Sequence, residues 1–184
     1  AQIRCDDCYL PFARAAAANK KISKAERARF DYQARSLGGS QVGMTAPDFM
    51  YTTPDGQTGR LSEIAEGPYI LLFVNDPTCD ECNLARIRLQ ADISLDWLID
   101  NGHMKVISIY PGLSNPEWVE QAKDYSDKWI VGACPDIDEL YDMRQTPTIY
   151  YLNGKHQILS KSFDIDRLLN AFYIVAEKFK KSAQ

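Results

Sequence analysis

Two cysteine pairs with the same spacing, Cys5-Asp6-Asp7-Cys8 and Cys79-Asp80-Glu81-Cys82, are the residues of this sequence with the clearest chemistry. They account for four of the five cysteines, and Cys134 is the fifth. Cysteines three residues apart on a helix are within disulfide reach and can also bind the same metal ion. The spacing therefore predicts redox chemistry or zinc binding, and the surrounding elements distinguish the two.

The second pair lies where a predicted strand meets a predicted helix. The run 69–74 is apolar throughout, which is typical of a strand buried on both faces, and residues 79–99 have a helical pattern. The free N–H groups and the dipole of a helix N-terminus stabilise a thiolate. We therefore expect Cys79 to be the attacking thiol and Cys82, one turn deeper, to be the resolving thiol of a dithiol/disulfide couple.

Zinc binding and a purely structural disulfide are the alternatives for this pair. A zinc site takes a second Cys or His pair from a nearby loop, and neither His103 nor His156 is spaced for that. Cys5 and Cys8 could complete a four-cysteine site only if the N-terminal arm folded over the helix. A strand followed by Cys-x-x-Cys and a helix favours redox chemistry, so we predict no metal and no cofactor.

Two further features lie close to this chemistry in the predicted fold. Thr146-Pro147 precedes a predicted strand, and an X-Pro bond at the start of a strand is a candidate cis peptide bond. Asp76, three residues before Cys79, is the nearest candidate proton acceptor. Its place before Pro77 is also typical of a turn residue, and this simpler interpretation stays open.

The order of elements predicts an α/β fold with a mixed central sheet and helices on both faces. Residues 9–37 are mostly helical in pattern and end at Leu37-Gly38-Gly39-Ser40, so we interpret residues 1–40 as a helical N-terminal extension and 41–184 as one domain. In that domain we expect strands at 48–52, 69–74, 105–110, 129–131, 148–152 and 157–162, and helices at 79–99, from 115, at 136–143 and at 164–180.

These motifs, in this order, resemble the thioredoxin-like proteins of the bacterial periplasm, in the branch with a β-hairpin before the core. The resemblance covers roughly residues 42–180, and the arm before Val42 is similar to a subgroup with N-terminal helical extensions. The segments that carry it are Val42-Gly43-Met44-Thr45-Ala46-Pro47-Asp48-Phe49, Asp55-Gly56, Leu61-Ser62-Glu63, the run 69–74, Cys79-Asp80-Glu81-Cys82 and Thr146-Pro147-Thr148.

The resemblance implies a thioredoxin fold and a thiol-disulfide oxidoreductase acting on protein thiols and disulfides, with a separate electron donor. Cys79 would be the nucleophile and Cys82 the resolving thiol of a redox-active disulfide. Pro147 would be cis and would shield the sulfurs from metal, while the backbone of Thr146 would pair with an extended substrate peptide. A protein of this kind is periplasmic, and a removed signal would also explain why the sequence starts at Ala1 without Met.

Three positions depart from the family pattern: Pro77-Thr78 replaces the usual Trp, Phe73 replaces the buried acid of many members, and Asp80-Glu81 replaces a neutral dipeptide. Two carboxylates beside a thiolate repel it. We therefore expect a more reducing couple than that of the strongly oxidising periplasmic enzymes, which favours a reductant or an isomerase.

Two rival functions share this fold. A thiol peroxidase needs Thr or Ser three residues before its reactive cysteine and Pro seven before, and Asp76 and Leu72 stand at these positions. The second rival is a binding or structural module whose disulfide is not catalytic. The remaining cysteines fit either case: we expect Cys134 to be a buried core thiol, and Cys5 and Cys8 to form a local disulfide, a second redox pair or a disordered end.

Composition excludes other classes. The chain has 184 residues, 45% of them hydrophobic and 25% charged, which is typical of a globular protein. The net charge of −4 disfavours nucleic acid, because binding phosphates needs clustered Lys and Arg. No apolar run approaches the roughly 20 residues of a membrane-spanning helix.

Overall fold

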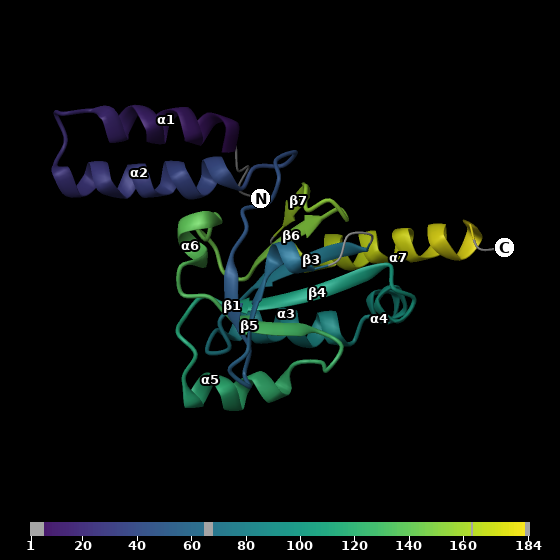
Figure 1. The fold of residues 1–184 in the computed structure, drawn as a ribbon. Helices are drawn as coiled ribbons and strands as arrows, with labels where there is room; N and C mark the ends of the chain where they lie inside the picture. Colours follow the sequence, from purple (N-terminus) through teal and green to yellow (C-terminus); the bar gives the residue numbers. More distant parts are fainter. Residues whose placement is uncertain (1–5, 65–67, 163, 183–184) are drawn as a thin grey trace.

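The computed structural model describes residues 6–64, 68–162 and 164–182 (Figure 1). Its centre is a seven-stranded mixed sheet with the strand order β2-β1-β5-β4-β3-β6-β7. The strands are β1 (Met50–Thr52), β2 (Thr58–Arg60), β3 (Tyr69–Val74), β4 (Met104–Tyr110), β5 (Ile130–Ala133), β6 (Thr148–Leu152) and β7 (Ile158–Ser162).

Strand β3 lies in the middle of the sheet, as its uninterrupted apolar run predicts. It pairs in parallel with β4 and antiparallel with β6, and five of its six residues are buried. Val74, its last residue, is opposite Thr148, the first residue of β6. The end of β3 and the start of β6 therefore meet at one edge of the sheet, and this edge carries the predicted chemistry.

Helices cover both faces of the sheet. On one face, Leu71 and Phe73 of β3 pack in a core with side chains from α3 (Asp80–Gln90), α4 (Ile93–Asp100) and α7 (Ile165–Ser182). On the other, Leu72 and Val74 pack with side chains from η1 (Leu61–Glu63) and α6 (Ile137–Leu140). A smaller cluster under α5 (Pro116–Gln121) and η2 (Ala122–Asp124) completes the domain. The predicted α/β architecture is thus confirmed.

The helix expected at 79–99 is two helices. Helix α3 ends at Gln90, and α4 begins at Ile93. Asp92 is the N-cap of α4, because its side chain accepts a hydrogen bond of 2.7 Å from the backbone N–H of Leu95. The expectation of one continuous helix was wrong because the apolar pattern of residues 79–99 continues across this cap.

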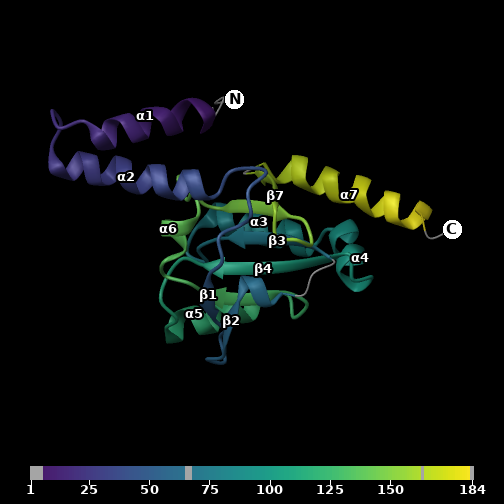
Figure 2. The same cartoon turned by 45° about the horizontal axis from the view of Figure 1, so that its top comes forward.

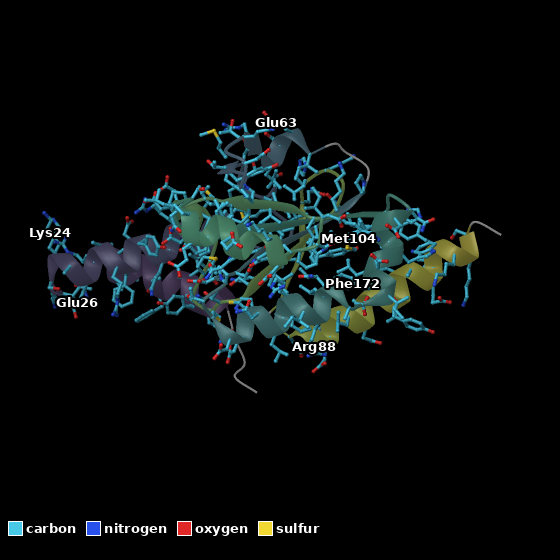
Figure 3. All side chains as sticks on the ribbon, turned by 90° about the horizontal axis from the view of Figure 1, so that it is seen from below. Lys24, Glu26, Glu63, Arg88, Met104 and Phe172 are labelled. Carbon is cyan, nitrogen blue, oxygen red and sulfur yellow. The ribbon has the colours of Figure 1, made fainter. Side chains whose placement is uncertain are left out.

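The N-terminal helical pattern is also two helices, α1 (Asp6–Ala18) and α2 (Lys24–Gly39). Ser23 and Glu26 form a capping box that starts α2, and the two helices pack through a small apolar cluster that includes Leu10 and Leu37. We call this pair of helices the arm. Lys24 and Glu26 mark its outer tip (Figure 3), and the arm and α7 extend in opposite directions (Figure 2).

The arm contacts the domain at its inner end. The hydroxyl of Tyr32 on α2 donates a hydrogen bond of 2.6 Å to Asp138 on α6. Ser40, the C-cap residue of α2, is buried and lies 3.2 Å from the hydroxyl of Tyr150 on β6. The arm is therefore joined by polar contacts to the segments on either side of the loop before β6.

Candidate active site

Cys79 is the N-cap residue of α3, as the sequence predicts. Its sulfur accepts a hydrogen bond of 3.3 Å from the backbone N–H of Cys82, so it already interacts with one of the unpaired N–H groups of the first turn. Cys79 is half-buried, whereas Cys82 is 0% exposed. Both are free thiols. The structure thus places an accessible sulfur at the helix end and a shielded one behind it.

Burial, helped by the adjacent Cys79, raises the pKa of the Cys82 thiol to about 12. The negative charge of Asp76 acts in the same direction. A hydrogen bond from the backbone of Asp76 to the Cys82 sulfur opposes this rise, because it stabilises the thiolate. At neutral pH Cys82 is therefore a protonated thiol held close to the sulfur of Cys79.

Asp76 holds the turn between β3 and α3. One of its carboxylate oxygens accepts hydrogen bonds of 2.8 Å from both the backbone N–H and the hydroxyl of Thr78, and its carbonyl accepts one of 3.0 Å from the N–H of Cys79. The side-chain amide of Asn83 also donates to the carbonyl of Pro77, at 2.7 Å. These contacts agree with the turn interpretation of Asp76, and its electrostatic effect on Cys82 places it near the resolving thiol.

Thr146 and Pro147 lie at the same edge of the sheet, directly before β6, and the peptide bond between them is cis. Pro147 lines a pocket of about 290 Å³ next to the Cys79 helix. The other lining residues come from α3 and from the start of α7: Glu81, Leu84, Ala85, Arg88, Asp164, Ile165 and Asp166. Arg88, labelled in Figure 3, forms an ion pair with Asp166 that joins the two helices across the pocket.

A buried polar cluster lies behind the turn, and the sequence analysis missed it. It consists of Asn75, Ser108 and Tyr125, which we call the Asn75 cluster. The amide of Asn75 donates to the hydroxyl of Ser108 at 2.7 Å and to the carbonyl of Phe73 at 3.1 Å, and the hydroxyl of Tyr125 donates to the Asn75 side-chain oxygen. Its one sequence signal is a polar residue directly after an apolar strand. Phe73, which replaces the buried acid of many thioredoxin-like proteins, is part of the core.

A second buried polar group lies in the loop before β6. The Asp142 carboxylate is 1% exposed and forms ion pairs with Lys161 of β7 and, at 2.7 Å, with Arg144. Burial alone would raise the pKa of Asp142, but hydrogen bonds from Arg144 and Lys161 outweigh it and lower the pKa to about 2. The guanidinium of Arg144 also lies 5.0 Å from the ring centroid of Tyr9 on α1, so this loop contacts the arm.

The other cysteines are placed differently. Cys134 is a free thiol, 4% exposed, in the core under β5, which confirms the prediction of a packed thiol. Cys5 lies outside the described residues, and Cys8, on α1, takes part in a disulfide.

Within residues 6–64, 68–162 and 164–182 no group of three or more His, Cys, Asp or Glu side chains is arranged to hold a metal ion. In the same part of the chain no helix is long and apolar enough to cross a membrane.

No protein-family model and no curated protein matches the chain. Solved structures do. A thioredoxin-like protein from Bacteroides caccae superposes with a TM-score of 0.79 at 26% identity, over 95% of this chain and 64% of that one. The match includes the arm, and the chain spans less than two thirds of that longer protein.

Two further structures match the domain. A conserved protein of unknown function from Bacteroides fragilis is 33% identical over 72% of this chain and 98% of its own, with a TM-score of 0.66. The thioredoxin domain of a thiol-disulfide oxidoreductase from Bacteroides vulgatus has a TM-score of 0.63 at 19% identity, over 76% of this chain and 97% of its own. The sheet order, the Cys79 helix and these similarities lead to one conclusion: the chain belongs to the thioredoxin-like family.

Proposed function

We propose that this protein is a thiol-disulfide oxidoreductase that acts on protein disulfides through Cys79 and Cys82. The observation that carries the proposal is the contact between them: the sulfur of Cys79 caps α3 and accepts the N–H of Cys82. A helix N-terminus stabilises the thiolate that attacks, and a shielded second thiol one turn away completes the exchange. Similar structures include the thioredoxin domain of a thiol-disulfide oxidoreductase, which agrees with this chemistry.

The exchange proceeds in two displacements. The thiolate of Cys79 attacks a substrate disulfide, a mixed disulfide forms, and the other substrate sulfur leaves as a thiolate that takes up a proton. Cys82 then loses its proton and attacks the sulfur of Cys79. The Cys79–Cys82 disulfide forms, and the second substrate thiol is released. Two electrons and two protons pass to the substrate, and an external dithiol donor returns them to the enzyme.

The substrate in this proposal is an extended polypeptide. Thr146 and Pro147 precede β6 at the edge of the sheet that carries Cys79, and the backbone of Thr146 is our candidate for pairing with the substrate chain. The neighbouring pocket has apolar surface from Leu84, Ala85 and Ile165 with charged residues around it, which suits a side chain of a peptide. Asp76 is the candidate acceptor for the proton that Cys82 releases.

The direction of the reaction follows from Asp80 and Glu81, which are both exposed in the first turn of α3. Their charges repel a thiolate at Cys79 and so favour the disulfide form of the couple. We therefore propose a reductant or an isomerase. Because the sequence resembles periplasmic thioredoxin-like proteins, we also propose that it works in the periplasm. Residues 1–40 form the helical extension of this enzyme, and residues 41–184 form its redox domain.

Reduction of insulin disulfides with dithiothreitol as electron donor tests the proposal. Wild type should accelerate insulin precipitation, and Cys79→Ser should abolish that acceleration. Cys82→Ser should accumulate a mixed disulfide with the substrate, visible by mass spectrometry under non-reducing conditions. Cys134→Ala is the matched control, because it removes a free thiol from the core, and it should keep activity. Activity that survives Cys79→Ser would exclude Cys79 as the nucleophile, whereas a wild type that does not accelerate precipitation would support the non-catalytic binding module instead.

A further inference from the structure

The Asn75 cluster takes no part in the exchange steps above, although it lies directly behind the turn that carries Cys79. Asn75 is 1% exposed and Ser108 is 2% exposed. Tyr125 is half-buried. Burying polar side chains costs free energy unless they are hydrogen-bonded, and these bond to one another. Ser108 and Tyr125 both bond to the side chain of Asn75, so the three side chains link β3, β4 and the segment after η2.

The cluster fixes the residue that precedes the turn. The backbone N–H of Asn75 donates to the carbonyl of Ile109 at 3.0 Å, and its side chain is held by three further hydrogen bonds. A residue bonded on both backbone and side chain cannot rotate without breaking several contacts. The orientation of the next peptide group, the N–H of Asp76, is therefore set by the Asn75 cluster.

That peptide group acts on the resolving thiol, because hydrogen bonding from the backbone of Asp76 lowers the pKa of Cys82 against the larger effects of burial and of Cys79. The charged or titratable groups that act on this sulfur are Cys79 and Asp76, and Cys82 and Asp76 in turn act on Tyr125. The guanidinium of Arg86, one turn after Cys82 on α3, lies over the Tyr125 ring, 5.2 Å from its centroid. Tyr125 is thus adjacent to Cys82 and bonded to the residue that orients its hydrogen-bond donor.

We propose that Tyr125 is a positioning residue for Cys82: its hydroxyl locks Asn75, so that the N–H of Asp76 faces the sulfur during the second displacement. This inference rests on the proposed function. In that step Cys82 gives up its proton and carries negative charge until the new S–S bond forms and the substrate thiolate leaves. An N–H already in place stabilises this charge, whereas a mobile turn would not.

The test separates the two displacements with the reagent 5,5′-dithiobis(2-nitrobenzoate). Attack by Cys79 releases one coloured thiolate, and attack by Cys82 on the resulting mixed disulfide releases the second. We expect Tyr125→Phe to leave the first rate unchanged and to slow the second about tenfold, which corresponds to about 1.4 kcal/mol. The pH profile of the second rate should also move to higher pH, because the thiolate loses stabilisation.

Two further variants show whether a slower second release comes from the Asn75 cluster. Ser108→Ala removes another contact of Asn75 and should slow the second release in the same way. Tyr151→Phe is the matched control, because Tyr151 has a buried hydroxyl with no hydrogen-bond partner in the described structure and lies outside the cluster. It should change neither rate. Thermal unfolding of each variant shows that it is folded under the conditions of the assay.

The assay distinguishes a failure of the positioning role of Tyr125 from a failure of the proposed function. If wild type and Cys82→Ser release the second thiolate equally, Cys82 is not a resolving thiol and the proposed function itself fails. If the second release depends on Cys82 but Tyr125→Phe matches Tyr151→Phe in rate and pH profile, only the positioning role is overturned. Equal slowing of both releases by Tyr125→Phe would also overturn it, because it indicates a general distortion of the site.

Discussion

Asp142 and Lys161 form an ion pair inside the protein, with side-chain exposures of only 1% and 8%. It joins the loop that leads to Thr146 and Pro147 to strand β7. Removing one member of a buried pair leaves the other charge without compensation. We expect Asp142→Asn to lower the free energy of unfolding by about 3 kcal/mol, measured by urea denaturation. Asp31→Asn, which removes an exposed pair with Arg35, should cost less than about 0.5 kcal/mol.

The carboxylate of Asp142 also makes the free energy of unfolding depend on pH in the acid range. The pKa of Asp142 is lowered from 3.8 to about 2 in the folded protein, so its contribution is present above pH 4 and is lost as the pH falls through 2. That contribution is about 2 kcal/mol. Urea midpoints measured from about pH 5 downward should converge between wild type and Asp142→Asn. Parallel curves across this range would contradict the buried ion pair.

Docking of the arm depends on Tyr32. Its hydroxyl donates to Asp138, and burial, then this hydrogen bond, raises the pKa of Tyr32. Tyr32→Phe should lower the free energy of unfolding by about 1 kcal/mol and speed amide hydrogen exchange in α2 more than in β3. Tyr173→Phe, at an exposed position of α7, is the control and should have no effect. Exchange that stays unchanged in α2 would show that other contacts hold the arm.

The two carboxylates after Cys79 set the redox balance in our proposal. The double substitution Asp80→Asn and Glu81→Gln removes repulsion of the thiolate and should make the couple more oxidising, by roughly 10–20 mV. Equilibration with glutathione buffers and quantification of the oxidised fraction measures this. A second pair of substitutions, Asp127→Asn and Glu120→Gln, changes the net charge equally at residues outside the site and should leave the potential within error. A shift toward a more reducing couple would exclude the electrostatic explanation.

The parts of the fold predicted from the sequence are those with signals close together in the chain. The apolar run of β3 and the cysteine at the start of α3 are contiguous, and β6 and β7 are joined by a short turn. The break between α3 and α4 had a local signal, Asp92 before Ile93, but the continuing apolar pattern outweighed it. Short-range patterns thus located the strand–cysteine–helix unit and the proline loop.

The polar contacts around the site could not be predicted in this way. Asn75 bonds Ser108, 33 residues later, because β3 pairs with β4. It also bonds Tyr125, 50 residues later, in the segment between η2 and β5. Asp142 and Lys161 are 19 residues apart and meet because β7 lies beside β6. Neither set has a recognisable spacing, since the partners are determined by strand order and register rather than by helix or strand periodicity.

Cys134 gives the protein an internal reporter of global opening. A thiol reagent cannot reach a side chain that is 4% exposed, so Cys134 reacts only in molecules that have unfolded, whereas Cys79 reacts in the native state. In a single labelling time course, the fast phase therefore counts accessible Cys79 thiols. The slow phase, in which the buried thiols of Cys82 and Cys134 react, measures the rate of unfolding when the reagent is in large excess. Kinetic stability and thiol reactivity can thus be measured together on the unmodified chain.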